Sequence, residues 1–297
     1  MPTYPIVIEH LTKRFGSVRA LEDVSFTVTP GRVTGFLGPN GAGKTTTLRI
    51  LLGLDQADSG QALVGERPYR DYPSSALVVG ASLEADSFHP GRSGRNHLRV
   101  YGAAMGADPE RIDEVLSMVG LTGAAGRKVG GYSLGMRQRL GLATALLADP
   151  PVLVLDEPAN GLDPEGIRWM RELLQYLAGQ GRTVLISSHL LGEVQQIAQD
   201  IVIINRGQVV AAGDLREIEA GRSTSVLVNS VDNAALARAL HAAQLSASRA
   251  GNQLAVTGAT PEAVGAIALQ AGVALTHLSQ SQDDLEAMFL ELTGGAR

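Results

Sequence analysis

The chain has 297 residues, a formal net charge of −5 and no cysteine. The lack of cysteine excludes disulfides, thiolate catalysis and cysteine-ligated zinc, and the acidic balance without a dense Lys/Arg block argues against nucleic acid as the main partner. No segment reaches the roughly 18 consecutive apolar residues that span a bilayer, and the amino terminus has no basic, apolar signal pattern. We therefore expect a cytosolic chain with one large α/β domain and one small domain.

The most informative segment follows a short apolar run at residues 33–37, which we expect to be a buried strand. It matches the phosphate-loop pattern G-x-x-x-x-G-K-[ST] in full and comprises Gly38, Pro39, Asn40, Gly41, Ala42, Gly43, Lys44, Thr45 and Thr46. Apolar residues at helical spacing come next, so the loop stands between a strand and a helix, as the motif requires. Its backbone amides can surround phosphate oxygens, Lys44 can reach the β- and γ-phosphates, and the Thr45 hydroxyl can hold Mg²⁺. The function is therefore predicted to be driven by a nucleotide.

A second short strand is expected at residues 77–80, and Glu84 follows it. Residues 131–139 then form a loop that opens another helix. Ser133 and Gly135 place a hydroxyl and a glycine at this helix start, which makes an anion site. On its own, Ser133 is better explained as an ordinary N-cap, and only the other motifs bring the anion site into consideration.

An apolar strand is expected at residues 152–155, and it runs into the adjacent carboxylates Asp156 and Glu157. Neighbouring residues of a strand point in different directions, so one carboxylate can hold Mg²⁺ while the other faces the attacking water. We assign Asp156 to the metal and Glu157 to the general base, and the reverse assignment stays open.

Another buried strand is expected at residues 183–188, with His189 directly after it. Ligands of parallel sheets bind at the carboxyl ends of the strands, so His189 is a candidate sensor of the γ-phosphate.

Beyond these motifs, residues 201–210 read as a hairpin and residues 214–220 as a short closing helix. The pattern changes at about residue 221. The remaining segments are expected in the order βαββαβ, at residues 224–230, 232–243, 245–249, 253–257, 261–271 and 274–279. This order matches a ferredoxin-like module, with a last helix that carries Leu285, Met288, Phe289 and Leu292 on one side. That apolar stripe is explained either by packing within the module or its dimer mate, or by a partner groove.

Taken in order, the motifs resemble those of the ATP-binding subunit of an ABC transporter over about residues 4–220. Gly38 to Thr46 resembles the Walker A motif, residues 132–138 the signature loop, residues 152–157 the Walker B motif, Gly161-Leu162-Asp163 the D-loop, and His189 the switch histidine. Phe15 resembles the aromatic residue that stacks on adenine. The resemblance implies an ABC-type P-loop NTPase in residues 1–220, with a mixed β-sheet core and a helical subdomain at about 84–145, followed by an accessory α+β module at 221–297. It also implies ATP and Mg²⁺ as cofactors.

In this family two such subunits bind head to tail, so Ser133 and Gly135 of one subunit would close over the γ-phosphate held by the other. The second subunit can be identical or different. The resemblance further implies a separate polytopic membrane permease, and a peripheral location on the cytoplasmic side of the membrane. Residues 87–95, which contain Phe88 and a proline turn, are either a solvated loop or a socket for a cytoplasmic helix of that permease.

Two departures from the common family pattern stand out. The signature reads Ser-Leu-Gly-Met, with Leu134 and Met136 in place of glycine and glutamine. Glu84 stands where the family usually places a glutamine, where it can accept from the catalytic water or approach Mg²⁺. Both departures resemble the ABC-2-type bacterial exporters of drugs, antibiotics and lipids whose ATPase is encoded separately. The alternatives are a soluble ABC ATPase acting on DNA or ribosomes and a nucleotide-binding regulator without turnover.

Overall fold

The computed structural model describes residues 3–83, 88–220, 224–251 and 253–282. The chain divides into two compact units, residues 1–215 and residues 216–297. The predicted helix at residues 285–292 lies outside the described residues. No helix within the described ranges is both long and apolar enough to cross a bilayer.

The first unit contains two sheets. An antiparallel sheet in the order β2-β1-β4 is formed by β1 (Ile6–Phe15), β2 (Val18–Val28) and β4 (Ser59–Val64). A mixed sheet in the order β5-β6-β7-β3-β8-β9 is formed by β3 (Val33–Leu37), β5 (Val79–Ser82), β6 (Val152–Leu155), β7 (Thr183–Ser188), β8 (Asp200–Asn205) and β9 (Gln208–Asp214). Its strands pair in parallel except for the β8–β9 hairpin.

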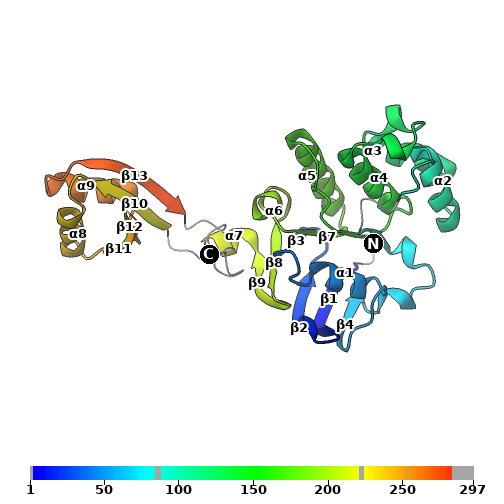
Figure 1. Cartoon of the computed structure of the whole chain (residues 1–297), viewed down its shortest axis with the longest axis horizontal. Helices are drawn as coiled ribbons and strands as arrows, with labels where there is room; N and C mark the ends of the chain where they lie inside the picture. The colour runs from blue at the N-terminus through cyan, green and yellow to red at the C-terminus, as the bar shows by residue number, and fades with distance from the viewer. Residues whose placement is uncertain (1–2, 84–87, 221–223, 252, 283–297) are drawn as a thin grey trace. The chain divides into compact units, whose positions relative to one another are not determined.

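Seven α-helices accompany these sheets in the described part of residues 1–220. They are α1 (Lys44–Leu51), α2 (Gly94–Met105), α3 (Pro109–Met118), α4 (Leu134–Leu146), α5 (Pro164–Gly179), α6 (Leu191–Ile197) and α7 (Leu215–Ala220). The antiparallel sheet and α1 lie on one face of the mixed sheet, and α5 and α6 lie on the other (Figure 1). Helices α2, α3 and α4 lie together at one end of the unit (Figure 1), within the segment predicted to be a helical subdomain.

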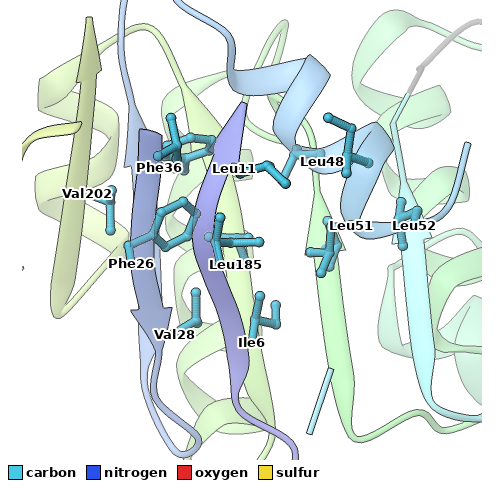
Figure 2. Close-up of a cluster of buried hydrophobic side chains, with 14 of the residues drawn as sticks. Ile6, Leu11, Phe26, Val28, Phe36, Leu48, Leu51, Leu52, Leu185 and Val202 are labelled. Atoms are coloured by element: carbon cyan, nitrogen blue, oxygen red, sulfur yellow. The ribbon is translucent and has the colours of Figure 1, made fainter. Parts of the chain in front are cut away.

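A large hydrophobic core fills the space between the two sheets (Figure 2). Phe26 of β2 and Phe36 of β3 meet there with ring centroids 5.0 Å apart. Helix α1 adds Leu48 and Leu51 to the same cluster, and both side chains are at most 1% exposed. Burial on this scale contributes roughly 1.5–3 kcal/mol for each large apolar side chain, so the core fixes the start of α1 against the carboxyl end of β3.

The predicted strands at residues 33–37, 152–155 and 183–188 and the hairpin at 201–210 are confirmed. The strand expected at residues 77–80 is placed wrongly. Residues Ser75–Leu77 form a 3₁₀ turn, and strand pairing begins only at Val79, which lies opposite Val152 of β6.

The second unit has the element order βαββαβ. Its elements are β10 (Thr224–Ser230), α8 (Asn233–Ala242), β11 (Ser246–Ala250), β12 (Gln253–Thr257), α9 (Pro261–Gln270) and β13 (Leu275–Gln282). The four strands form an antiparallel sheet in the order β11-β12-β10-β13. A small separate core includes Val226, Leu236, Leu240 and Val264. This element order is that of the ferredoxin-like motif.

Candidate active site

The phosphate loop connects β3 to α1. Gly43 is the residue before α1 and has φ 110°, a left-handed conformation that residues with a Cβ rarely adopt. A Cβ at this position would also lie 2.6 Å from Leu21 Cδ2 and 2.7 Å from the Ala20 carbonyl oxygen. The motif glycine is therefore required both by its backbone conformation and by the close approach of β2.

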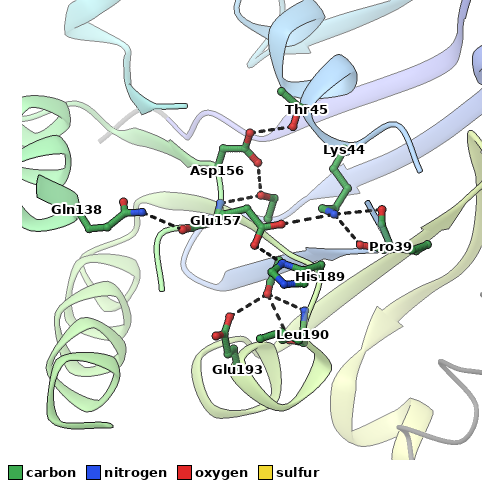
Figure 3. Close-up of polar contacts among 12 residues, drawn as sticks. Pro39, Lys44, Thr45, Gln138, Asp156, Glu157, His189, Leu190 and Glu193 are labelled. Atoms are coloured by element: carbon green, nitrogen blue, oxygen red, sulfur yellow. Dashed lines mark hydrogen bonds and ion pairs between the residues drawn. The ribbon is translucent and has the colours of Figure 1, made fainter. Parts of the chain in front are cut away.

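Lys44 begins α1 and is only 5% exposed. Its Nζ donates to the carbonyl oxygens of Gly38 at 2.6 Å and Pro39 at 3.4 Å, and it lies 3.5 Å from Glu157 Oε1 (Figure 3). A buried cation needs such compensation. The loop thus presents a positive charge and the amino terminus of a helix at the same point, which is the arrangement that binds phosphate.

Thr45 and Asp156 meet across the site. Thr45 Oγ1 donates to Asp156 Oδ2 at 2.9 Å, and the Ser187 hydroxyl donates to the other carboxylate oxygen (Figure 3). Burial raises the pKa of the Asp156 carboxyl above its usual value, while the hydrogen bonds from Ser187 and Thr45 and the charge of Lys44 oppose that rise. A bound cation would favour the ionised carboxylate further.

Glu157 follows directly but turns away from Asp156. Its φ of 49° is left-handed, which is uncommon for a residue with a side chain. Its backbone N–H donates to Ser187 Oγ at 2.9 Å, and His189 Nδ1 donates to its Oε2 at 2.7 Å. The side chains of Asp156 and Glu157 contact different residues, as predicted. The cause of their separation is the left-handed backbone at Glu157, and not the alternation of side chains along a continuing strand.

Of these groups, Lys44, Thr45, Glu157 and His189, but not Asp156, line a cavity of about 360 Å³. It is lined by Val18, Arg19, Ala20, Pro39, Asn40, Gly41, Gly43, Lys44, Thr45, Thr46, Glu157, Asn160 and His189. In the described ranges, no three His, Cys, Asp or Glu side chains cluster as a metal site. Mg²⁺ needs no such cage, since it is usually held by one or two carboxylates together with substrate phosphates and water. The Thr45 hydroxyl and the Asp156 carboxylate are the hard oxygen ligands that fit this ion.

Phe15, predicted to stack on adenine, ends β1 and is 50% exposed. It pairs across the hairpin with Val18, which lines the cavity. The ammonium group of Lys13 lies 5.3 Å from the centroid of its ring. Phe15 therefore stands at the rim of the cavity as an exposed aromatic surface.

The signature and D-loop residues lie elsewhere in the subunit. Ser133 caps α4 by accepting from the Met136 N–H at 3.2 Å, and Asp163 caps α5 by accepting from the Gly166 N–H at 2.8 Å. Neither residue, nor Gly135, is among those that line the cavity. The Ser133 hydroxyl is thus an N-cap, as its position alone predicts, at an exposed helix start. The predicted contact of Glu84 falls outside the described residues.

Sequence reasoning did not single out three residues of the site. Ser187 holds both carboxylate residues, Asn160 lines the cavity, and the buried Gln138 donates from α4 to the Glu157 carbonyl oxygen at 3.4 Å. Ser187 had one available signal, because it is the second-last residue of a buried strand and lies two residues before His189.

Comparisons with known proteins identify the family. A family model described as ABC transporter matches residues 21–160, and a domain of unknown function, DUF8746, matches residues 224–286. An uncharacterized ABC transporter ATP-binding protein, YhcH of Bacillus subtilis (strain 168), is 36% identical over 97% of this chain and 95% of its own length. The Nod factor export ATP-binding protein I of Burkholderia lata is 36% identical over 99% of this chain and 98% of its own. The bacitracin transport ATP-binding protein BcrA of Bacillus licheniformis is 42% identical over 67% of this chain and 66% of its own.

Solved structures agree with this result. The ATP-binding subunit of an ABC transporter matches with a TM-score of 0.66 and 26% identity, over 73% of this chain and 92% of that one. A dimeric bacterial ABC transporter cassette matches in fold with a TM-score of 0.66 and 24% identity, over 71% of this chain and 99% of that one. The chain therefore belongs to the ATP-binding subunits of ABC transporters, a family of P-loop ATPases that function as dimers with a membrane subunit.

Proposed function

We propose that this chain binds MgATP between two head-to-tail copies of itself and hydrolyses it to drive a separate membrane permease of a bacterial exporter. One observation carries the catalytic part. Thr45 donates to Asp156, while Glu157 lies 3.5 Å from the Lys44 ammonium group and accepts from His189. A metal site and a general base thus flank the point where a γ-phosphate would sit, which is the division of labour that ATP hydrolysis requires.

Each residue then has a role. Lys44 and the loop amides hold the phosphates, and Thr45 and Asp156 hold Mg²⁺, which supplies charge neutralisation of the phosphoryl group when bound. Glu157 accepts a proton from the attacking water, and His189 orients the Glu157 carboxylate through its 2.7 Å hydrogen bond. Phe15 offers its exposed ring to adenine.

The exported cargo is proposed from the relatives. Proteins named for bacitracin transport, lantibiotic transport and Nod factor export are 36–42% identical to this chain. We assign the chain to the same class, exporters of antibiotics and amphiphilic molecules.

A groove offers a place for the permease. It has a volume of about 510 Å³ and lies between the core and the helical segment. Its apolar wall includes Leu52, Leu54, Phe88 and Tyr101, of which Leu54 is 57% exposed. Such a surface fits the apolar face of a helix, so we propose that a cytoplasmic helix of the permease docks here, beside residues 88–95.

Two measurements test the proposed function. The purified chain should release phosphate from ATP only with Mg²⁺, and an affinity-tagged chain should retain a polytopic membrane protein after mild solubilisation of membranes. Recovery with ribosomes or DNA instead, or an ATPase stimulated by nucleic acid, would support the soluble alternative. Tight ATP binding without turnover would support a regulator.

A further inference from the structure

Helix α2 carries a buried histidine whose ring makes no hydrogen bond to the described residues. His97 is 2% exposed, and its ring contacts those of Phe88 and Tyr101, whose centroids lie 4.9 and 4.7 Å away. Neither Nδ1 nor Nε2 has a hydrogen-bond partner in the part of the chain that the structure describes. Both polar atoms of the imidazole are therefore buried and unsatisfied.

The other buried polar side chains of this protein are nearly all satisfied. Among those in the described ranges, Thr34 and His97 are the two without a side-chain hydrogen bond. Those with one are Lys44, Thr47, Gln138, Thr183, Ser187 and Ser188. Thr34 lies within β3 and lines neither the cavity at the phosphate loop nor the groove of about 510 Å³. Because an unsatisfied buried polar group is destabilising, His97 calls for a reason other than stability.

The His97 ring lines the groove that we assign to the permease helix. Most of the wall around it is apolar, and the other polar groups there are largely engaged. Arg49 is the one charged residue among the described residues that line the groove, and its Nε lies 2.7 Å from Asp55 Oδ2. The Thr144 hydroxyl donates to the Leu140 carbonyl oxygen at 2.9 Å. His97 thus offers the groove a polar group that has no competing partner among the described residues.

The chemistry of the groove favours a neutral partner for this ring. Burial, followed by the charge of Arg92, lowers the pKa of His97 to about 4, so the imidazole is neutral at pH 7. A neutral imidazole donates from one nitrogen and accepts at the other. A carboxylate would lose its hydration here without gaining a cation, since Arg49 is already paired with Asp55. A hydroxyl or an amide matches the ring without that penalty.

We infer that His97 determines which helix the groove accepts, by hydrogen-bonding one hydroxyl or amide side chain on the otherwise apolar face of that helix. That the helix belongs to the permease rests on the proposed function. A matching helix satisfies the imidazole when it docks. A helix that brings only apolar side chains leaves the ring unsatisfied and binds more weakly, so the same group that destabilises the isolated subunit selects the partner.

The probe for this inference is a set of four helical peptides of one design. Each has leucine and alanine on one face and glutamate and lysine on the other, and a single central position of the apolar face is leucine, asparagine, serine or glutamate. Binding to the full chain is measured by fluorescence anisotropy. The wild type should bind the asparagine and serine peptides about fivefold or more tightly than the leucine and glutamate peptides. Leu54→Asp, at the exposed wall of the groove, should weaken binding of all four.

Two substitutions of His97 separate hydrogen bonding from packing. His97→Phe keeps an aromatic ring beside Phe88 and Tyr101 but removes both nitrogens, whereas His97→Gln keeps a donor and an acceptor but removes the ring. His97→Phe should bind the asparagine peptide about 5- to 100-fold more weakly than the wild type, and His97→Gln should regain part of that loss. Stability in urea should follow the reverse order, with His97→Phe the more stable of the two variants. His241→Phe, exposed in the second unit, should change neither measurement.

Several outcomes would overturn the inference. They are equal binding of the leucine and asparagine peptides by the wild type, a preference for the glutamate peptide, and an unchanged preference for asparagine in His97→Phe. Binding that follows the same order as stability would reduce His97 to a packing role. If no peptide binds, both the inference and the docking groove are wrong, while ATP hydrolysis with Mg²⁺ is measured separately. A tagged His97→Phe chain that retains the permease as well as the wild type does would overturn the inference and leave the proposed function standing.

Discussion

Glu157→Gln should stop hydrolysis while leaving ATP binding intact. The amide keeps the size of the side chain, and the backbone bonds that hold this residue, from its N–H to Ser187 and from Gln138 to its carbonyl, do not involve the side chain. What is lost is a carboxylate 2.7 Å from His189 and 3.5 Å from Lys44. Removal of a general base typically costs about 10²- to 10⁴-fold in rate, which corresponds to about 3–5 kcal/mol in activation free energy.

The affinity of Glu157→Gln for ATP should rise while its rate of hydrolysis falls. Glu157 is an anion beside the phosphate site, so its neutral amide repels ATP less, and we expect MgATP to accumulate in a closed dimer. Lys44→Ala provides the contrast, because it removes the buried cation that contacts the phosphates. Its affinity for ATP should fall by about 10- to 100-fold, the range for hydrogen bonds made by charged groups.

The assays are phosphate release, equilibrium binding of ATP, and the dimer fraction by size-exclusion chromatography, each with and without Mg²⁺. Glu165→Gln is the control for loss of an acidic side chain, since Glu165 lies exposed in the first turn of α5. The reasoning is refuted if Glu157→Gln binds MgATP poorly and stays monomeric. That result would make Glu157 the metal ligand and Asp156 the base.

Two further predictions concern other parts of the chain. A chain that ends after Ala220 should keep its affinity for ATP, because residues 1–215 form a compact unit and the site lies wholly within it. The same chain should dimerise or assemble with the permease more weakly. Loss of ATP affinity in a folded truncated chain would contradict this prediction. His97 is 2% exposed, and burial, followed by the charge of Arg92, lowers its pKa to about 4 from 6.5. The folded protein thus binds a proton at His97 less tightly than the unfolded chain does. Above pH 6.5 the contribution of His97 to the free energy of unfolding is therefore constant. It falls by about 3 kcal/mol as the pH drops from 6.5 to 4. In urea unfolding at a series of pH values, His97→Phe should remove this fall in the free energy of unfolding, whereas the exposed control His241→Phe should retain it. If the free energy of unfolding depends on pH equally in the wild type and His97→Phe, the prediction is contradicted.

The phosphate loop and the two carboxylates could be predicted because each is contiguous in sequence and follows a strongly apolar strand. The role of Ser187 could not be predicted in this way, because it depends on the register of the sheet. Strands β6 and β7 pair in parallel with Leu155 opposite Ile186. The residues that follow these two along the chain, Asp156 and Ser187, are thereby brought within hydrogen-bond distance.

Other differences have local causes. The run Leu77-Val78-Val79 is apolar throughout, so it carries no alternation from which the first paired residue could be found, and the 3₁₀ turn takes up Leu77. The contact between Leu134 and Gly161 could not be predicted either. Leu134 stood out in the sequence only as a departure from the family signature, and its partner Gly161 lies 27 residues further along, in a left-handed turn that the sequence pattern does not reveal.

The central claim is that one site is built from two subunits, and mixing two inactive variants tests it most directly. Lys44→Ala removes the phosphate lysine, and Ser133→Arg blocks the signature that acts on the other copy. In a mixed dimer, the intact phosphate loop of the Ser133→Arg subunit faces the intact signature of the Lys44→Ala subunit, so one complete site is regained. An equal mixture should recover up to roughly a quarter of wild-type activity, since half of the dimers are mixed and each has one of its two sites intact. If tagged subunits are shown to exchange and the mixture is still as inactive as either variant alone, the head-to-tail site is contradicted.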